Sequence, residues 1–202
     1  MIQTIFGSTV VILKPDNFKE LFPDELYNEI VEHLMGPDNK FVDHPYTRGG
    51  KICTTDLNSS MQDKIHRVGG LLDFLKQTGL KYAGLYSDKP VKDLKFHTMW
   101  INLSFQGCEI KNHYDRYEDT VEKTLIILFY PKAPVGGSNL VFMHNSKYGE
   151  WASEYSESDM VKIRIEEGDI AIFDNFALHA VDRHGVEEPR MCVATEFKLD
   201  ID

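Results

Sequence analysis

Apolar residues in the first half of the chain recur at helical spacing and predict two helices before residue 95. The first helix begins at Pro23, because proline suits the first turn, where its missing N–H would have had no partner. Gly36-Pro37 ends it, and a short strand over residues 9–13 comes before it. Its apolar stripe consists of Leu26, Ile30, Val31 and Leu34.

The second predicted helix has a less regular pattern. Gly69-Gly70 weakens its middle, and Gly79 is placed to close it. We expect both helices to pack against the rest of the protein and to carry no chemistry. The apolar positions of the second helix are Leu57, Met61, Ile65, Val68, Leu72 and Leu75.

From Lys95 onward the pattern shortens to strands that glycine and proline turns separate. The intervals leave no room for the crossovers that parallel strands need, so the strands are expected to be antiparallel. This predicts a mostly β fold with N-terminal helices, of α+β class, in which a jelly roll forms the core. The predicted strands cover residues 96–105, 125–130, 140–143, 162–165, 169–173 and 191–199.

Length and composition fit one soluble domain. A chain of 202 residues can bury a sizeable core, and 42% hydrophobic with 27% charged residues is ordinary for a globular protein. We expect residues 1–202 to form one domain, in which residues 1–95 support a catalytic core over residues 96–202. No stretch is apolar enough to cross a membrane and no secretory signal opens the chain, which predicts a cytoplasmic protein.

Charge and cysteine content exclude two classes of function. The formal net charge of -10, without a local cluster of lysine or arginine, repels a phosphate backbone, so nucleic acid is not an expected partner. Cys53, Cys108 and Cys192 are far apart and lack a CxxC spacing. They therefore indicate neither a disulfide framework nor a thiolate zinc site.

A candidate metal site begins at His113 and Asp115. Side chains two residues apart in extended backbone point to the same face, so these two can hold one ion. His179, which follows another predicted strand, can supply a third ligand. Two histidines and one carboxylate occupy one face of an octahedral iron(II) and leave positions open for other ligands. His-x-Asp alone often arises by chance, and the order of the surrounding elements makes the pattern more specific.

That order resembles the prolyl-4-hydroxylase-like branch of the 2-oxoglutarate- and iron(II)-dependent oxygenases. After Asp115 come a hydrophobic strand, Gly136-Gly137, Glu167-Gly168-Asp169 before a further strand, His179, and Arg190 at the start of the last strand. The resemblance covers about residues 100–198, half of the chain. Residues 99–102 also resemble a smaller group of uncharacterised bacterial and phage oxygenases.

The resemblance implies a double-stranded β-helix, a cupin-like jelly roll, with His113, Asp115 and His179 as ligands of iron(II). It also implies 2-oxoglutarate and dioxygen as co-substrates, with Arg190 pairing with the distal carboxylate of 2-oxoglutarate. The implied reaction releases succinate and carbon dioxide and hydroxylates a substrate, a small molecule or a peptide. Peptidyl proline, a free amino acid and a small metabolite all stay open, and so does the oligomeric state.

Residues on strands that are expected to line the barrel are further candidates to contact 2-oxoglutarate, although alternation alone does not say which face each takes. Arg190 is preferred to Arg183 because the strand that carries His179 is expected to turn and return as its antiparallel neighbour, with Arg183 in the turn. Cys192 and Ala194 share the face of Arg190 and are small enough to leave it space. The other candidate contacts are Asn102, Thr124 and Tyr130, whereas His97, His144 and His184 are interpreted as bystanders.

Two other functions stay open at this point. The same scaffold could form a sensor that binds a metal and a small molecule without turnover, because a fold does not guarantee activity. It could also form a cupin-like enzyme that uses iron or manganese without 2-oxoglutarate, in which case Arg190 would be structural. The complete triad together with Arg190 favours the oxygenase. An acidic and aromatic segment over residues 148–159 is either a substrate-contacting insertion or a solvated loop.

Overall fold

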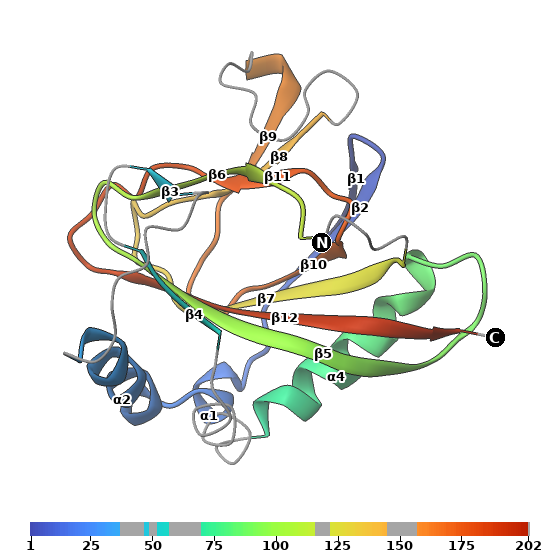
Figure 1. Cartoon of the computed structure of the whole chain (residues 1–202), viewed down its shortest axis with the longest axis horizontal. Coiled ribbons are helices and arrows are strands. Elements are labelled where there is room, and N and C mark those ends of the chain that lie inside the picture. Colours follow the sequence, from blue (N-terminus) through green and yellow to red (C-terminus); the bar gives the residue numbers. More distant parts are fainter. Residues whose placement is uncertain (37–46, 49–51, 57–69, 116–121, 145–156, 202) are drawn as a thin grey trace.

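Two antiparallel sheets face each other in the computed structural model, which describes residues 1–36, 47–48, 52–56, 70–115, 122–144 and 157–201 (Figure 1). The larger sheet has the strand order β1-β2-β10-β7-β12-β5-β4, and the smaller has the order β3-β6-β11-β8-β9. The elements are β1 (Ile2–Ile5), β2 (Ser8–Leu13), α1 (Phe18–Leu21), α2 (Asp24–Met35), β3 (Thr47–Arg48), β4 (Ile52–Asp56), α4 (Leu71–Tyr82), η1 (Ala83–Leu85), β5 (Val91–Ser104), β6 (Glu109–His113), β7 (Thr124–Lys132), β8 (Leu140–Met143), η2 (Glu157–Asp159), β9 (Met160–Ile163), β10 (Ile170–Asp174), β11 (His179–Val181) and β12 (Arg190–Ile201).

The predicted mostly β, antiparallel architecture is confirmed. Each strand predicted from residue 96 onward is present, with ends shifted by a few residues. The strands β1, β3, β4, β6 and β11 had no range in the sequence prediction. They span two to five residues each and, unlike β8 and β10, contain no run of four apolar residues that would stand out in the sequence. None of the helices in the described ranges is long and apolar enough to cross a lipid bilayer.

The outer face of the larger sheet packs against the helices. Residues at alternate positions of the central strands join buried residues of α2 and α4 in one apolar cluster. The helix predicted from Pro23 is confirmed: Pro23 immediately precedes α2, and the stripe residues Leu26, Ile30 and Leu34 are buried. Val31 is half-buried and packs at the margin of the same cluster.

The prediction that Gly79 closes the second helix was wrong. Gly79 lies inside α4, which continues to Tyr82, and the predicted positions 57–68 lie outside the described residues. The glycine is required by close approach to the sheet: a β-carbon there would lie 2.6 Å from Ile127 Cδ1 and 2.9 Å from Leu94 Cδ1. Glycine at position 79 therefore reflects a close contact between helix and sheet and not the end of the helix.

We expect Gly79→Ala to lower the free energy of unfolding by about 1–2 kcal/mol. Overpacking a core costs about 1–3 kcal/mol, which outweighs the roughly 0.5–1 kcal/mol that alanine gains over glycine inside a helix. Equilibrium urea unfolding measures this difference. Gly84→Ala is the matched control, because a β-carbon at Gly84 meets open space. A Gly79→Ala protein as stable as the unmodified chain would contradict the packing argument.

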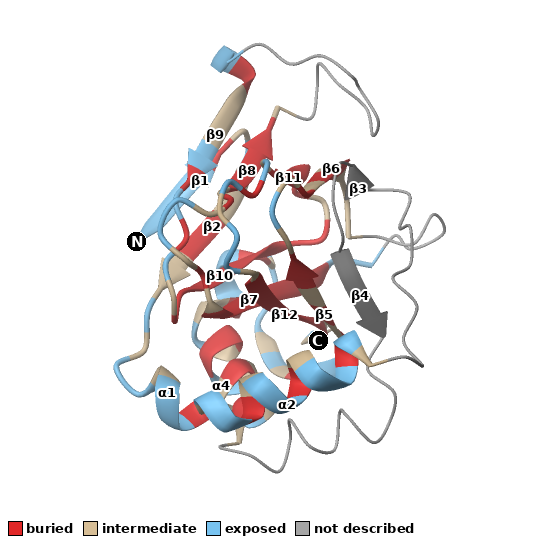
Figure 2. Cartoon of the chain, turned by 90° about the vertical axis from the view of Figure 1, so that its left-hand side faces the viewer, coloured by how far each residue is buried: buried red, intermediate tan, exposed pale blue. Residues whose placement is uncertain are grey.

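The inner face of the larger sheet meets the smaller sheet across a second apolar cluster. Figure 2 shows buried strands lining the space between the sheets. Along β12, Met191 and Val193 belong to the outer cluster, whereas Cys192 and Ala194 belong to the inner one. Side chains at 190, 192, 194 and 196 therefore share the inner face of β12, because the alternation holds up to the β-bulge after Glu196.

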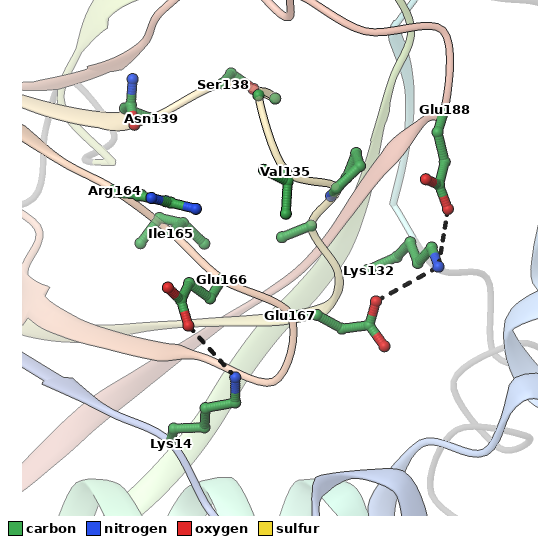
Figure 3. A pocket seen from close by; sticks show the side chains of 14 residues that line it. Lys14, Lys132, Val135, Ser138, Asn139, Arg164, Ile165, Glu166, Glu167 and Glu188 are labelled. Carbon is green, nitrogen blue, oxygen red and sulfur yellow. Dashed lines mark ion pairs between the residues drawn. The ribbon is translucent and has the colours of Figure 1, made fainter.

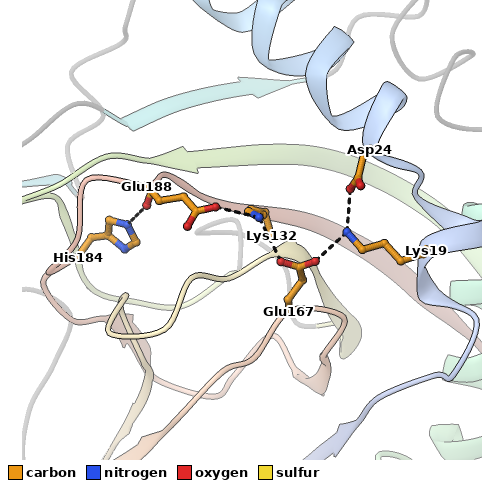
Figure 4. A network of polar contacts seen from close by, with 6 residues as sticks. All are labelled: Lys19, Asp24, Lys132, Glu167, His184 and Glu188. Carbon is orange, nitrogen blue, oxygen red and sulfur yellow. Dashed lines mark hydrogen bonds and ion pairs between the residues drawn. The ribbon is translucent and has the colours of Figure 1, made fainter.

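A chain of ion pairs connects the N-terminal helices to one end of the barrel (Figure 4). Lys19 of α1 pairs with Asp24 of α2 and with Glu167, both at 2.7 Å. Lys132 at the end of β7 pairs with Glu167 at 3.4 Å and with Glu188 at 2.8 Å. These side chains are 29–73% exposed, and pairs that reach solvent contribute at most about 1 kcal/mol each. The network therefore orients the helices more than it stabilises them.

His184 holds the loop between β11 and β12 in place, although the sequence suggested a bystander. It is buried, the Ser138 backbone N–H donates to its Nδ1 at 3.2 Å, and its Nε2 lies 2.7 Å from the Glu188 carbonyl oxygen. Because Nδ1 accepts, Nε2 must carry the proton and donate to Glu188. Backbone hydrogen bonds join the same residue to Gly107 and Cys108. The loop that leads to Arg190 is thus anchored at its centre.

We expect His184→Ala to destabilise the protein by about 2 kcal/mol and to lower the Tm by about 5 °C, because a buried Ser138 N–H loses its acceptor. Thermal unfolding followed by circular dichroism measures the shift. His33→Ala, at an exposed position of α2, serves as the control. Equal Tm values for the two variants would mean that the His184 ring does not anchor the loop.

Candidate metal centre

The structure brings His113, Asp115 and His179 together. His113 ends β6 and His179 begins β11, and the two residues are direct partners across these neighbouring strands. Asp115 follows β6 by two residues, with Oδ1 3.5 Å from His113 Nε2 and Oδ2 3.4 Å from His179 Nε2. One potential ligand atom from each residue lies within 4.8 Å of the others. Three donors at this spacing can reach a single ion.

Backbone carbonyls orient both imidazole rings. His113 Nδ1 lies 2.8 Å from the Lys111 carbonyl oxygen, and His179 Nδ1 lies 3.0 Å from that of Ala177. A carbonyl can only accept, so each Nδ1 carries the proton and donates. Each Nε2 is then left with its lone pair directed to the side where Asp115 lies. This tautomer is the one that a metal-binding histidine with a fixed outer hydrogen bond adopts.

The electrostatics of the site suit a divalent cation. Burial lowers the pKa of His179 to about 4, with repulsion from His113 acting in the same direction, so its ring is neutral at pH 7. Burial alone would raise the pKa of Asp115, but the adjacent histidines outweigh burial and leave that pKa below its usual value. The cluster presents a carboxylate and a neutral imidazole, and these are the protonation states that bind metal.

Arg190 lies on the inner face of β12 and is almost completely buried. Its side chain is 1% exposed, and neither Nε nor Nη1 has a hydrogen-bond partner among the residues that the structure describes. The guanidinium lies 5.2 Å from the centre of the Tyr130 ring. A buried cation without an anion is costly, so this position favours a negatively charged group beside it.

The expected route from His179 to Arg190 was wrong, although both side chains belong to the barrel interior. The strand β11 pairs with β6 and β8 in the smaller sheet, whereas β12 pairs with β5 and β7 in the larger. The chain therefore crosses from one sheet to the other, and the two residues lie on opposite walls of the barrel. Sequence alone could not separate a hairpin from a crossover, since both connect antiparallel strands by a short loop. Arg183 is exposed in this loop.

The three weaker candidates lie on the same inner face but in different surroundings. Tyr130 lies beside Arg190, and its buried hydroxyl has no nitrogen or oxygen partner within the described ranges, with the weakly hydrogen-bonding Cys192 thiol as a neighbour. Asn102 is half-buried and opposite Cys192 across the β5–β12 ladder. Thr124 is at the other end of β7, where its hydroxyl donates to Glu196 at 2.6 Å. Tyr130 is therefore well placed to share a ligand with Arg190, and Thr124 is not.

Sequence reasoning missed two inner-face residues. Ser104 is the partner of Arg190 across the ladder, and its buried hydroxyl also has no partner among described residues. Glu196 is a buried acid six residues after Arg190. The alternation along β12 is the signal that could have found Glu196, because counting by twos from Arg190 places it on the inner face.

A separate pocket of about 700 Å³ lies outside the candidate metal centre (Figure 3). Its lining includes neither a residue of the triad nor Arg190. Lys14 pairs with Glu166 at 3.7 Å, and Lys132 pairs with Glu167 and Glu188. The positive and negative side chains that line this pocket largely neutralise one another, so the pocket does not favour a ligand of either charge.

Comparison with known proteins identifies the fold. No family profile matches the sequence, and no curated protein matches it. Among solved structures, EvdO2 from Micromonospora carbonacea var. aurantiaca complexed with 2-oxoglutarate has a TM-score of 0.63 and 13% identity, covering 94% of this chain and 86% of that one. An oxidoreductase of the 2OG-Fe(II) oxygenase family from Burkholderia pseudomallei has a TM-score of 0.56 and 12% identity, covering 94% and 84%.

A third structure is a prolyl hydroxylase in complex with a hypoxia inducible factor oxygen degradation domain peptide fragment, from Trichoplax adhaerens. Its TM-score is 0.57 with 14% identity, and the match covers 95% of this chain and 83% of that one. Identities this low carry information about the fold alone. The fold of this chain is therefore the double-stranded β-helix of the 2-oxoglutarate- and iron(II)-dependent oxygenases, as the sequence resemblance implied.

Proposed function

We propose that this chain is an iron(II)- and 2-oxoglutarate-dependent dioxygenase. The observation that carries the proposal is the combination, in one barrel interior, of a His-Asp-His cluster with a buried Arg190 whose Nε and Nη1 have no hydrogen-bond partner among the described residues. The cluster alone would suit many metal proteins. The Arg190 guanidinium is buried, and no anion lies beside it among the described residues. Such a group suits a co-substrate that brings a carboxylate.

His113, Asp115 and His179 would hold iron(II), because their three donors converge and both outer hydrogen bonds are in place. Arg190 would hold the distal carboxylate of 2-oxoglutarate, with the hydroxyl of Tyr130 as a second donor. When bound, iron(II) and 2-oxoglutarate supply the activation of dioxygen and the electrons for it, with release of succinate and carbon dioxide. The inner cluster of apolar residues keeps water away from this chemistry.

Hydroxylation is the outcome that we propose, on a small molecule or a peptide. Support comes from two similar structures: EvdO2 is complexed with 2-oxoglutarate, and the Trichoplax prolyl hydroxylase is in complex with a peptide. An intact carboxylate ligand at Asp115 fits a triad with open positions for co-substrate and dioxygen. The segment over residues 148–159 lies mostly outside the described residues, so its part in substrate binding stays a prediction.

Succinate formation tests the function without a known substrate. The iron(II)-loaded protein should convert 2-oxoglutarate slowly to succinate in air, and His179→Ala should abolish this conversion. Binding of 2-oxoglutarate without any succinate above the His179→Ala level would favour the sensor. Oxygen consumption that is independent of 2-oxoglutarate would favour the cupin-like enzyme, in which Arg190 is structural.

A further inference from the structure

Glu196 is a buried carboxylic acid on the inner face of β12 that the proposed chemistry does not use. It is 4% exposed and shares this face with Arg190, Cys192 and Ala194. Among the described residues its hydrogen-bond donor is the hydroxyl of Thr124, 2.6 Å from Oε1. Acidic side chains are rarely buried unless they are paired. One neutral hydroxyl is a weak partner for such a group.

Glu196 and Arg190 lie at opposite ends of one inner face. Six residues of extended strand separate the two, which corresponds to about 20 Å. The His179 ring lies 4.8 Å from the ring of Phe173, and Phe173, Ile126 and Glu196 are successive partners across β10, β7 and β12. The triad therefore lies nearer to Glu196 than to Arg190 along β12. Burial raises the pKa of Glu196, and the hydrogen bond from Thr124 and the charges of His97 and Lys198 oppose this increase.

This arrangement divides the barrel interior into two halves. The half on the Arg190 side suits the co-substrate, so the half on the Glu196 side is left for the substrate. The charges of iron(II), Asp115, doubly charged 2-oxoglutarate and Arg190 cancel one another. The Glu196 carboxylate then leaves one negative charge on the buried inner face, since the charge of nearby Lys198 pairs with Glu122 at 3.7 Å. A singly charged cation would balance it.

We propose that Glu196 is a substrate-binding residue and that the substrate carries a protonated amine, which pairs with this carboxylate. The division of the barrel into a co-substrate half and a substrate half rests on the proposed function. The positive charge expected of the substrate rests on the position of Glu196. Thr124 is the positioning residue, because its hydroxyl fixes Oε1 and leaves Oε2 to accept from the ammonium group.

Saturation-transfer NMR with two small probes of equal shape tests the proposal. In the unmodified protein with Mn(II) and 2-oxoglutarate bound, butylammonium should receive saturation from the protein, and 1-butanol should receive far less. Glu196→Gln preserves the acceptor for Thr124 and removes the charge, and it should weaken butylammonium binding about tenfold, as expected for one lost charge-assisted contact. Asp200→Asn is the control, because Asp200 is a partly exposed carboxylate of the same strand that pairs with Lys95.

The paramagnetism of Mn(II) locates the probe. Butylammonium protons should relax faster when Mn(II) is bound, and Glu196→Gln should remove this enhancement. Equal signals for butylammonium and 1-butanol in the unmodified protein would overturn the inference without any variant, as would unchanged binding in a folded Glu196→Gln protein. Failure of the unmodified protein to bind Mn(II), by electron paramagnetic resonance, would instead contradict the proposed function. The saturation-transfer comparison does not need the metal and would still decide the role of Glu196.

Discussion

Asp115→Ala and His179→Ala should each weaken iron(II) binding by more than about a hundredfold, since the loss of an outer hydrogen-bond partner alone costs about 10–100-fold. The donors His113, Asp115 and His179 are the group of three or more metal-binding side chains found among the described residues. An open three-ligand site has no spare protein donor to replace one that is lost. Anaerobic titration of iron(II) against a chromophoric chelator measures the affinity.

His144→Ala is the matched control for the metal-ligand variants. His144 directly follows β8, its ring contacts Phe6 at a centroid distance of 5.1 Å, and it does not belong to the group of converging donors. We therefore expect its removal to leave iron(II) affinity within about twofold of the unmodified protein, because effects of residues that do not act on one site are largely independent. Full affinity in Asp115→Ala and His179→Ala would show that the ligands are misassigned, whatever the control does.

Arg190→Met should have opposite effects on 2-oxoglutarate binding and on stability. Loss of a bidentate, charge-assisted contact costs about 2–5 kcal/mol, so affinity for 2-oxoglutarate should fall about 30-fold or more. The protein without 2-oxoglutarate should become more stable, by about 1–4 kcal/mol, because an apolar side chain replaces a buried cation that has no anionic partner among the described residues. A residue with a merely structural role would not shift the two quantities in opposite directions.

Calorimetry with a redox-inert metal measures the affinity for 2-oxoglutarate, and thermal unfolding with and without 2-oxoglutarate measures stability. Arg183→Ala is the control, because Arg183 is exposed in the loop between β11 and β12. It should leave both quantities nearly unchanged. A greater loss of affinity in Arg183→Ala than in Arg190→Met would refute the assignment of the anchor.

The sequence predicted the class of fold and the residues of the His-Asp-His cluster for physical reasons. Strands of nine or more residues, such as β7 and β12, are long enough for their apolar runs to be recognised. His113 and Asp115 come together because two residues of extended backbone return side chains to one face. The start of α2 at Pro23 and its apolar stripe could also be predicted, since helix capping and helical periodicity are local properties of the sequence.

Features that depend on distant contacts could not be predicted. Gly79 looked like a helix end because its contacts with Ile127 and Leu94 involve residues far away in sequence. The connection from His179 to Arg190 looked like a hairpin because the choice between staying in one sheet and crossing to the other depends on the global topology. The hydrogen bond between Thr124 and Glu196 joins residues 72 positions apart, so the pairing of the buried acid had no local signature.

On the proposed function, the crossing between β11 and β12 bears on which keto acids can be accepted. His179 and Arg190 are the two ends of one short, unbroken piece of chain, and His184 fastens its middle to Ser138, Cys108 and Glu188. This loop links the backbone positions of the two residues, and their side chains span the rest of the distance between metal and guanidinium. Inserting or deleting residues between 180 and 189 would move the two backbone positions relative to each other. Such a change should therefore alter which length of dicarboxylate bridges the two groups, even with every residue that touches the acid retained.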